Sequence, residues 1–199
     1  MHAPSVDTGV AWMLEQLWGP IVAVTAAHDG RANGLISSTV LTASLLPEAP
    51  RIAVQLGKTS LTHELVLGSG ALAAHLLPAE GDRGLDLFRA LGLRSGRDGA
   101  KLAEFPTRRG VTGSPVLEDA VAHVEGRLVA TLDVVDMTVV LADVVGGGHR
   151  ENEEFLTIEQ VRARLPAEWL AEWELRYETE LREARKLRAI STGNPPRVF

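Results

Sequence analysis

The sequence predicts a mainly β protein, an antiparallel barrel with a few helices and a C-terminal helical extension. Short apolar runs follow one another between Gly, Pro, Asn and Asp residues, and only two short helical patterns lie among them. A parallel βαβ sheet would need a helix after nearly every strand, so an antiparallel barrel is favoured. After the three glycines at 146–148 the pattern becomes charged and helical. We therefore divide the chain into a barrel domain at 1–150 and a helical extension with an extended tail at 151–199.

The strands of the barrel domain are apolar or β-branched runs that lie between turn residues. The run His28-Asp29-Gly30-Arg31 holds residues that tolerate positive φ and is expected to form a hairpin turn between the first two strands. The predicted strands span 21–27, 34–46, 51–56, 71–77, 121–132 and 137–145.

Helices are expected at a few places in the same domain. Apolar residues at helical spacing predict one at 10–18, which Gly19-Pro20 ends. Each of the others is followed by a glycine, which favours a helix end: 62–67 with Gly68, and 84–91 with Gly92.

The extension after residue 150 has the pattern of two helices. Thr157 and Gln160 fit a capping box, and Pro166 fits the first turn of a second helix. Opposite charges stand four residues apart in this second helix, which predicts ion pairs between Glu172 and Arg176 and between Glu178 and Arg182.

Three aromatic residues, Trp169, Trp173 and Tyr177, recur every four residues along the otherwise charged second helix. Such a stripe at helical spacing usually packs into a core. We therefore expect it to dock on the barrel or on a dimer partner, in preference to a cofactor or membrane role.

Composition excludes several classes of protein. The net charge is -6 and the only lysines are at 58, 101 and 186, so the basic field that nucleic acid requires is missing. The absence of cysteine excludes disulfides, thiolate catalysis and Cys-ligated metals. No apolar run reaches 18 residues, and residues 1–10 lack a basic region followed by an apolar one. We expect a cytoplasmic protein with no membrane and no nucleic-acid partner.

Hydroxyl side chains gather between residues 33 and 63. On a strand successive side chains face opposite ways, so these hydroxyls cannot all meet one ligand, and some are ordinary strand residues. The window contains Ser37, Ser38, Thr39, Thr42, Ser44, Thr59, Ser60 and Thr62.

The loop at 57–62 has the composition of an anion site. Gly57 allows close approach to backbone N–H groups, Lys58 carries a positive charge, and three hydroxyl donors precede a predicted helix start. The spacing of a P-loop is missing, as is the strand-to-helix context of a dinucleotide-binding GxGxxG motif. The loop therefore predicts a site for a phosphate group.

Other candidates for chemistry are weaker. Ser114 lacks the GxSxG context of a hydrolase nucleophile. The charged residues Asp98, Lys101, Arg108 and Arg109 are expected to form a solvated loop, with contact to a nucleotide substrate as the alternative. The histidines do not have metal-ligand spacing, which predicts that no metal site is formed by His28, His63, His75, His123 or His149.

Several separate motifs together resemble the short-chain flavin reductases, whose fold is the FMN-binding split β-barrel, a Greek-key antiparallel barrel. The matching segments lie in the same order and at similar spacing over roughly residues 10–148. They are 33–44 (NGLISSTVLTAS), 57–64 (GKTSLTHE), Phe88, 95–98 (SGRD) with Lys101, 108–117 (RRGVTGSPVL) and Ala130-Thr131.

This resemblance implies a homodimer that binds FMN, or alternatively FAD, near the subunit interface. It places Ser37, Ser38, Thr39, Thr42, Ala43 and Ser44 along the flavin ring and ribityl chain. It places Lys58, Ser60 and Thr62 at the phosphate, together with Gly57 of the same loop, and gives Asn33, Gln55 and His63 as further cofactor-binding candidates. No catalytic residue is expected from the chain, because the flavin carries the hydride chemistry.

The family pattern differs at one hairpin. Family members commonly have Gly-Asp-His followed by Thr at the nicotinamide, whereas this chain has Val135-Asp136-Met137-Thr138. Met137 cannot donate a hydrogen bond or carry a charge. The leading hypothesis is an oxidoreductase that passes a hydride from NAD(P)H to flavin and on to free flavin, a partner oxygenase or a small acceptor. The alternative is a flavin-binding carrier or interaction module without reductase activity.

Overall fold

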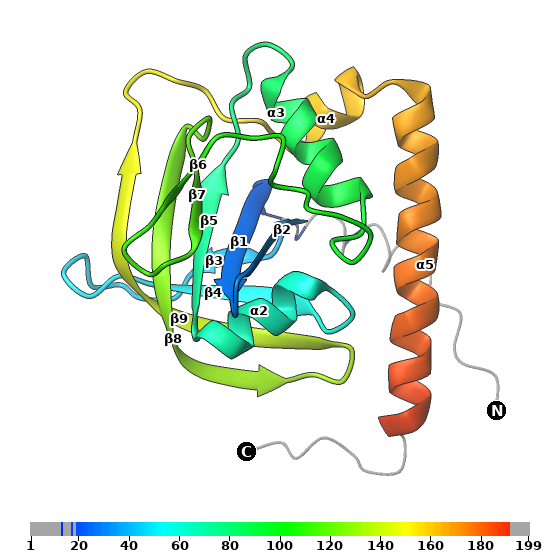
Figure 1. Cartoon of the computed structure of the whole chain (residues 1–199), viewed down its shortest axis with the longest axis horizontal. Coiled ribbons are helices and arrows are strands. Elements are labelled where there is room, and N and C mark those ends of the chain that lie inside the picture. Colours follow the sequence, from blue (N-terminus) through cyan, green and yellow to red (C-terminus); the bar gives the residue numbers. More distant parts are fainter. Residues whose placement is uncertain (1–12, 14–16, 18, 192–199) are drawn as a thin grey trace.

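The computed structural model describes residues 13, 17 and 19–191, and its main feature is one antiparallel sheet (Figure 1). The helix predicted at 10–18 and the tail after 191 lie almost entirely outside these residues. The strands are β1 Val22–His28, β2 Arg31–Ser37, β3 Val40–Thr42, β4 Arg51–Gly57, β5 Ala71–Leu76, β6 Thr107–Arg109, β7 Pro115–Leu117, β8 Ala122–Asp133 and β9 Met137–His149.

Helices cover the ends and one side of the sheet. In Figure 1, α3 and α4 lie together at one end, α2 at the other, and the long α5 beside the sheet. The helical elements are α2 Leu61–Ser69, α3 Arg83–Phe88, the π-helical turn η1 Arg89–Leu93, α4 Ile158–Arg164 and α5 Ala167–Ser191.

The large sheet curls on itself. Its strand order is β2-β1-β5-β8-β9-β4-β3, so β2 and β4 are separated by four other strands. Nevertheless residues of both strands line one cleft, which requires the sheet to bend round. The long β8 and β9 carry register shifts after Glu125 and Leu128, and such bulges increase local bend and twist. The predicted antiparallel barrel with a C-terminal helical extension is confirmed.

Two apolar clusters stabilise the fold. One fills the inside of the curled sheet under α2 and includes Val54, Leu56 and Leu72, all with no exposed surface. The other joins β1 and β7 to α3, η1 and α4, and contains Leu156 and Val161 from the segment after residue 150. Helix α4 is therefore part of the barrel's second core.

Helix α5 docks through the aromatic stripe. The Phe88 and Trp173 rings meet edge to face with centroids 5.5 Å apart, and the Arg89 guanidinium lies 4.4 Å from the Trp169 ring centroid. The expected docking on the barrel is thus confirmed for the two tryptophans. Tyr177 is 53% exposed and does not join the core.

Short patterns of neighbouring residues predicted the positions of most helices and strands closely. Asp29 and Gly30 have φ of 48° and 73°, as a two-residue hairpin between antiparallel strands requires. The capping box at the start of α4 is present, with the Gln160 N–H donating to Thr157 Oγ1 and the Thr157 N–H to Gln160 Oε1.

Several boundaries were predicted wrongly. The strand expected at 34–46 is broken between β2 and β3, and the strands β6 and β7 were missed. Gly68 lies inside α2, whose C-cap residue is instead Gly70 in the left-handed conformation (φ 65°). Gly92 lies within η1 and does not end the helix. The glycines at 146–148 continue β9 opposite β8 and do not end the sheet.

The ion pairs predicted along α5 are replaced by others. Glu172 lies 3.3 Å from Arg89 of η1, and Arg176 instead pairs with Glu180 at 2.9 Å. Arg182 donates to Thr179 Oγ1 at 3.0 Å. For Glu172, a partner on the barrel replaces the predicted partner on the same helix, since exposed i,i+4 pairs contribute only about 0.3–0.5 kcal/mol.

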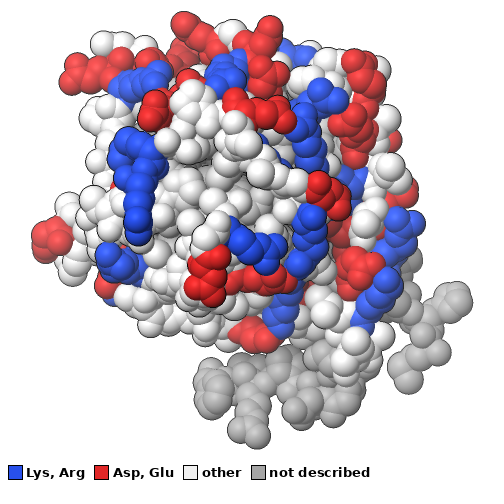
Figure 2. Space-filling view, viewed as in Figure 1, with Lys and Arg blue, Asp and Glu red and all other residues white. Residues whose placement is uncertain are grey.

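Charges of both signs are interleaved on the surface. Figure 2 shows blue and red side chains alternating along α5 and around an uncharged central area of the viewed face. This face carries no extended basic field of the kind that nucleic acid binds. Among the described residues, no helix combines the length and apolar character needed to cross a membrane.

Candidate functional site

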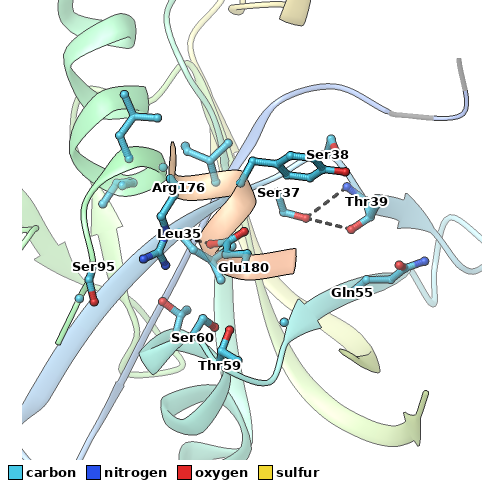
Figure 3. Close-up of a pocket in the computed structure, with 18 of the residues that line it drawn as sticks. Leu35, Ser37, Ser38, Thr39, Gln55, Thr59, Ser60, Ser95, Arg176 and Glu180 are labelled. Atoms are coloured by element: carbon cyan, nitrogen blue, oxygen red, sulfur yellow. Dashed lines mark hydrogen bonds and ion pairs between the residues drawn. The ribbon is translucent and has the colours of Figure 1, made fainter. Parts of the chain in front are cut away.

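A cleft of about 500 Å³ lies between the curled sheet, η1 and α5. Figure 3 shows side chains converging on it from β2, from β4 with the loop after it, and from α5. The predicted cofactor-binding residues that line it are Asn33, Ser37, Ser38, Thr39, Gln55, Gly57, Ser60 and Thr62. Strands and loops far apart in the sequence therefore bring most of the predicted set to one place.

The break after β2 presents hydroxyl groups to the cleft. Ser37 ends β2, its Oγ lies 3.1 Å from Thr39 Oγ1, and it accepts a hydrogen bond from the Thr39 N–H. The Gln55 N–H in turn donates to the Thr39 carbonyl. Because these bonds hold the short turn at 37–39, Ser37, Ser38 and Thr39 all line the cleft despite the alternation expected of a regular strand.

The phosphate-type loop at 57–62 leads directly into α2. Ser60 is the N-cap residue, and its Oγ accepts from the His63 N–H at 3.1 Å. The remaining N–H groups of the first turn have no partner within the helix, and the positive end of the helix dipole lies there. Gly57, Thr59, Ser60 and Thr62 line the cleft, so this end is suited to an anion.

Asn33 connects the two walls of the cleft. Its side chain is 2% exposed and donates from Nδ2 to Thr62 Oγ1 at 3.0 Å, while Oδ1 is buried without a partner among the described residues. A β-carbon on Gly96 would lie 2.2 Å from Asn33 Nδ2, so the glycine permits the loop to close over the asparagine. An unsatisfied buried acceptor is costly, and a hydrogen-bond donor from a ligand in the cleft would satisfy it.

Two predicted residues, Lys58 of the loop and His63 of α2, face elsewhere. Lys58 Nζ lies 2.6 Å from Asp133 Oδ2, and this bond lowers the pKa of the Asp133 carboxyl. His63 is buried and its Nε2 lies 2.9 Å from Thr138 Oγ1. Burial, reinforced by the Lys58 charge, lowers the pKa of His63. Neither residue lines the cleft of this chain.

Three further predicted residues, Thr42, Ala43 and Ser44, lie at and beyond the end of β3. The Ala43 N–H donates to the Arg51 carbonyl, and Ser44 Oγ accepts from the Leu46 N–H. Thr42 and Ala43 are exposed, Ser44 is half-buried, and none lines the cleft. The structure thus separates this edge of the sheet from the other predicted residues.

Sequence reasoning missed the wall that α5 contributes. Trp173, Arg176, Tyr177, Glu180, Leu181 and Ala184 all line the cleft. The helical repeat of the aromatic stripe was the available signal, but a stripe on an amphipathic helix indicates a buried face without indicating what lies opposite.

Lys101 also lines the cleft and was expected in a solvated loop. It is 6% exposed, and its Nζ donates to the Leu91 carbonyl at 2.7 Å. Burial, with the charge of Arg176 as a smaller cause, lowers the pKa of Lys101 to about 8. The cleft therefore contains cations from two separate segments, one buried and one on α5.

Elsewhere the described residues offer little alternative chemistry. They contain no group of three or more His, Cys, Asp or Glu side chains arranged to hold a metal ion. Ser114 is buried, and its Oγ has no hydrogen-bond partner among the described residues. The nearby Thr112 Oγ1 accepts from the Ser114 N–H. The cleft is the main candidate site.

Comparison with known proteins agrees with this assignment. A flavin reductase (NADH) from Kitasatospora aureofaciens is 33% identical over 145 residues, covering 72% of this chain and 72% of that protein. A high molecular weight rubredoxin from Moorella thermoacetica is 32% identical over 111 residues, covering 55% of this chain. This chain spans only 47% of the rubredoxin's length.

The crystal structure of an FMN-binding protein from Thermus thermophilus superposes with a TM-score of 0.63 at 25% identity, covering 76% of this chain and 80% of that one. A family model described as the flavin reductase like domain matches residues 14–164, which confirms the resemblance seen in the sequence. The match ends before α5. With most of its length matched and the cleft residues in place, the chain belongs to the flavin reductase-like family.

Proposed function

We propose that the protein is an FMN-binding oxidoreductase that takes a hydride from NAD(P)H. The observation that carries this proposal is the convergence of the predicted flavin-binding residues from β2, β4 and the 57–62 loop on one cleft. The name of the Kitasatospora aureofaciens relative, flavin reductase (NADH), supports the nicotinamide donor. Free flavin, a partner oxygenase or a small molecule would receive the electrons.

The residues present fit a flavin mononucleotide. The cleft volume of about 500 Å³ falls within the range of about 300–1,000 Å³ typical of small-molecule sites. Leu35, Ile36 and Leu91 supply apolar surface for a ring, and Ser37, Thr39 and Gln55 supply polar groups. FAD is the second flavin to be tested, because the same cleft would take the portion the two cofactors share.

When bound, the flavin would supply the hydride-accepting centre. The chain would hold its phosphate with the hydroxyls of Thr59, Ser60 and Thr62 and the N-terminus of α2. Asn33, whose Oδ1 has no hydrogen-bond partner among the described residues, would orient the ligand. Trp173 and other residues of α5 would exclude water from one side of the cleft.

The alternative is a flavin-binding protein without reductase activity, and Met137 is the observation that favours it. Met137 lines the cleft at the position where family members commonly carry histidine. A thioether offers no hydrogen bond donor and no charge to a nicotinamide.

Purified protein with FMN is expected to oxidise NADH repeatedly, which is measured as loss of absorbance at the nicotinamide band with the protein present at substoichiometric amount. NADPH and FAD replace NADH and FMN in parallel reactions. Bound flavin that stays oxidised when NADH is added would refute the reductase and support the alternative. Failure to bind either flavin would refute both the reductase and the alternative of a flavin-binding protein without reductase activity.

We also propose that the protein is a homodimer. Among the described residues, strand β3 lies at the edge of the sheet, and an edge strand favours association. Leu41, Leu45 and Leu46 on β3 and the loop after it are 57%, 100% and 56% exposed. Leu132 on the β8–β9 hairpin is 57% exposed. A second copy packed here would also cover Thr42, Ala43 and Ser44.

Replacing Leu41 and Leu45 together by aspartate is expected to convert the dimer to a monomer, because two charges would be buried at the interface. Light scattering after size exclusion measures the mass. Leu67→Asp is the matched control, since Leu67 is exposed on α2 away from this edge. A double variant that keeps the mass of the parent dimer, or a parent that is monomeric, would contradict the proposal.

A further inference from the structure

We infer that α5 completes the ligand site and that Arg176 binds the phosphate of the flavin, making this helix a determinant of ligand choice. The inference rests on the proposed function and concerns a segment beyond the family match, which ends at residue 164. It assigns the positive charge at the phosphate to the C-terminal extension and not to the loop lysine.

The first observation is where the positive charges of the site lie. Lys58, the cation expected from the sequence, pairs with Asp133 at 2.6 Å and does not line the cleft. Among the described residues, the cleft-lining lysines and arginines are Lys101 and Arg176. Lys101 is buried and already donates to the Leu91 carbonyl, which leaves Arg176 as the more accessible cation.

The second observation is the direction of the Arg176 side chain. Figure 3 shows Arg176 and Glu180 extending from α5 into the cleft, toward the side where Ser60 and Thr59 lie. A phosphate between them would receive hydroxyl donors from the loop and guanidinium donors from the helix. Phosphate and guanidinium form paired, charge-assisted hydrogen bonds.

The third observation is that Arg176 has donors to spare. Its Nε donates to Glu180 Oε1 at 2.9 Å, and a guanidinium has five N–H donors. The pair joins residues four apart on a helix, with side chains 26% and 51% exposed, and such pairs are weak. A phosphate, which carries a higher charge than a carboxylate, can therefore displace Glu180 from the Arg176 guanidinium.

The position of Arg176 is fixed by the docking of α5. Trp173, one turn before it, packs edge to face on Phe88, and Trp169 packs under the Arg89 guanidinium. Residues three apart on a helix share a face, so this docking turns Arg176 toward the cleft. The arrangement supplies a preorganised donor.

The test compares FMN with riboflavin, which differ only in the phosphate. Arg176→Met is expected to raise the dissociation constant of FMN about tenfold or more and to leave that of riboflavin unchanged within about twofold. Glu180→Gln should tighten FMN by about threefold, because it releases the guanidinium. Fluorescence quenching of each flavin by the full-length protein measures these constants without turnover.

Arg182→Met is the matched control, since Arg182 lies on the same helix, bonds Thr179 and does not line the cleft. Equal weakening of both flavins, or an unchanged preference for FMN in Arg176→Met, would overturn the inference. A change confined to the KM for NADH in riboflavin-loaded protein would assign Arg176 to the nucleotide and overturn it too. A parent protein that binds neither flavin would instead refute the proposed function.

Discussion

Lowering the pH from 7 to 4 is expected to remove about 3 kcal/mol from the free energy of unfolding through one side chain, His75. This histidine lies on β5, is 1% exposed, and connects three strands. Its Nδ1 lies 3.0 Å from the Ala23 carbonyl of β1, and its Nε2 lies 3.2 Å from the Leu117 backbone N of β7.

These two partners fix the charge state of His75. A carbonyl can only accept and a backbone N–H can only donate, so Nδ1 carries the proton and Nε2 is the acceptor. Protonation of Nε2 would direct an N–H at the Leu117 N–H. Burial is the main reason that the pKa of His75 is lowered to about 4. Among the neighbouring side chains, His123 and Arg108 lower this pKa and Glu125 raises it.

The direction of this pH effect on the free energy of unfolding follows from proton uptake by the unfolded chain. Between the unfolded pKa of about 6.5 and the folded pKa, the unfolded state binds a proton that the folded state does not. The stabilising effect of neutral His75 is therefore complete above about pH 6.5 and is lost as the pH falls toward 4.

Urea denaturation of the parent and of His75→Gln at pH 7 and pH 4 measures this effect. The variant should be less stable at pH 7, and its deficit should shrink by about 3 kcal/mol at pH 4. His149→Gln, an exposed histidine at the end of β9, should keep the pH dependence of the parent. If His75→Gln does not fold, NMR of the parent should show a His75 ring still neutral at pH 5, and a ring protonated there would contradict the expectation.

The second large effect is expected from Gly57→Val, which should weaken FMN binding about 100-fold with little loss of stability. Along β4 the residues Ile52, Val54 and Leu56 are buried in the core. Side chains alternate in a strand, so a side chain at 57 faces the other way, on the same side as the cleft-lining Gln55.

The structure explains why Gly57→Val should weaken FMN binding without destabilising the fold. A β-carbon at Gly57 would have no atom within 4 Å, and the residue does not have positive φ. Valine is also a good strand former. The fold therefore tolerates the substitution, whereas the added methyl groups occupy space in the cleft that a ligand needs.

Gly99→Val is the control, because Gly99 also has free space around its β-carbon but does not line the cleft. FMN titration gives the dissociation constants, and thermal unfolding checks the stability of both variants. Unchanged FMN affinity in Gly57→Val, with a normal unfolding temperature, would show that the ligand binds elsewhere.

The sequence predicted best what depends on neighbouring residues. The Asp29-Gly30 turn and the Thr157–Gln160 capping box are each specified by residues within a few positions of one another. The hydroxyls at 37–39 and the 57–62 loop were predicted for the same reason, since each is a short run with its own chemistry.

Features that depend on distant partners were not predictable in this way. The Lys58 charge is paired with Asp133, 75 positions away, and the two are brought together because β4 and β8 both pair with β9. Arg176 enters the cleft because Trp173 finds Phe88 on a different element. The aromatic repeat on α5 predicts that a face of the helix is buried, but it does not identify Phe88 as the partner, and no local pattern links Lys58 to Asp133.

The shape of the cleft depends on the number of residues in the π-helical turn η1. A π-turn holds more residues than an α-helical turn, and Leu91, Gly92 and Leu93 within η1 line the cleft. Deleting one residue there would let an ordinary α-helix form and rotate the side chains that follow within the helix by about 100° about the helix axis. A one-residue insertion or deletion in η1 could thus remodel this wall as thoroughly as several substitutions.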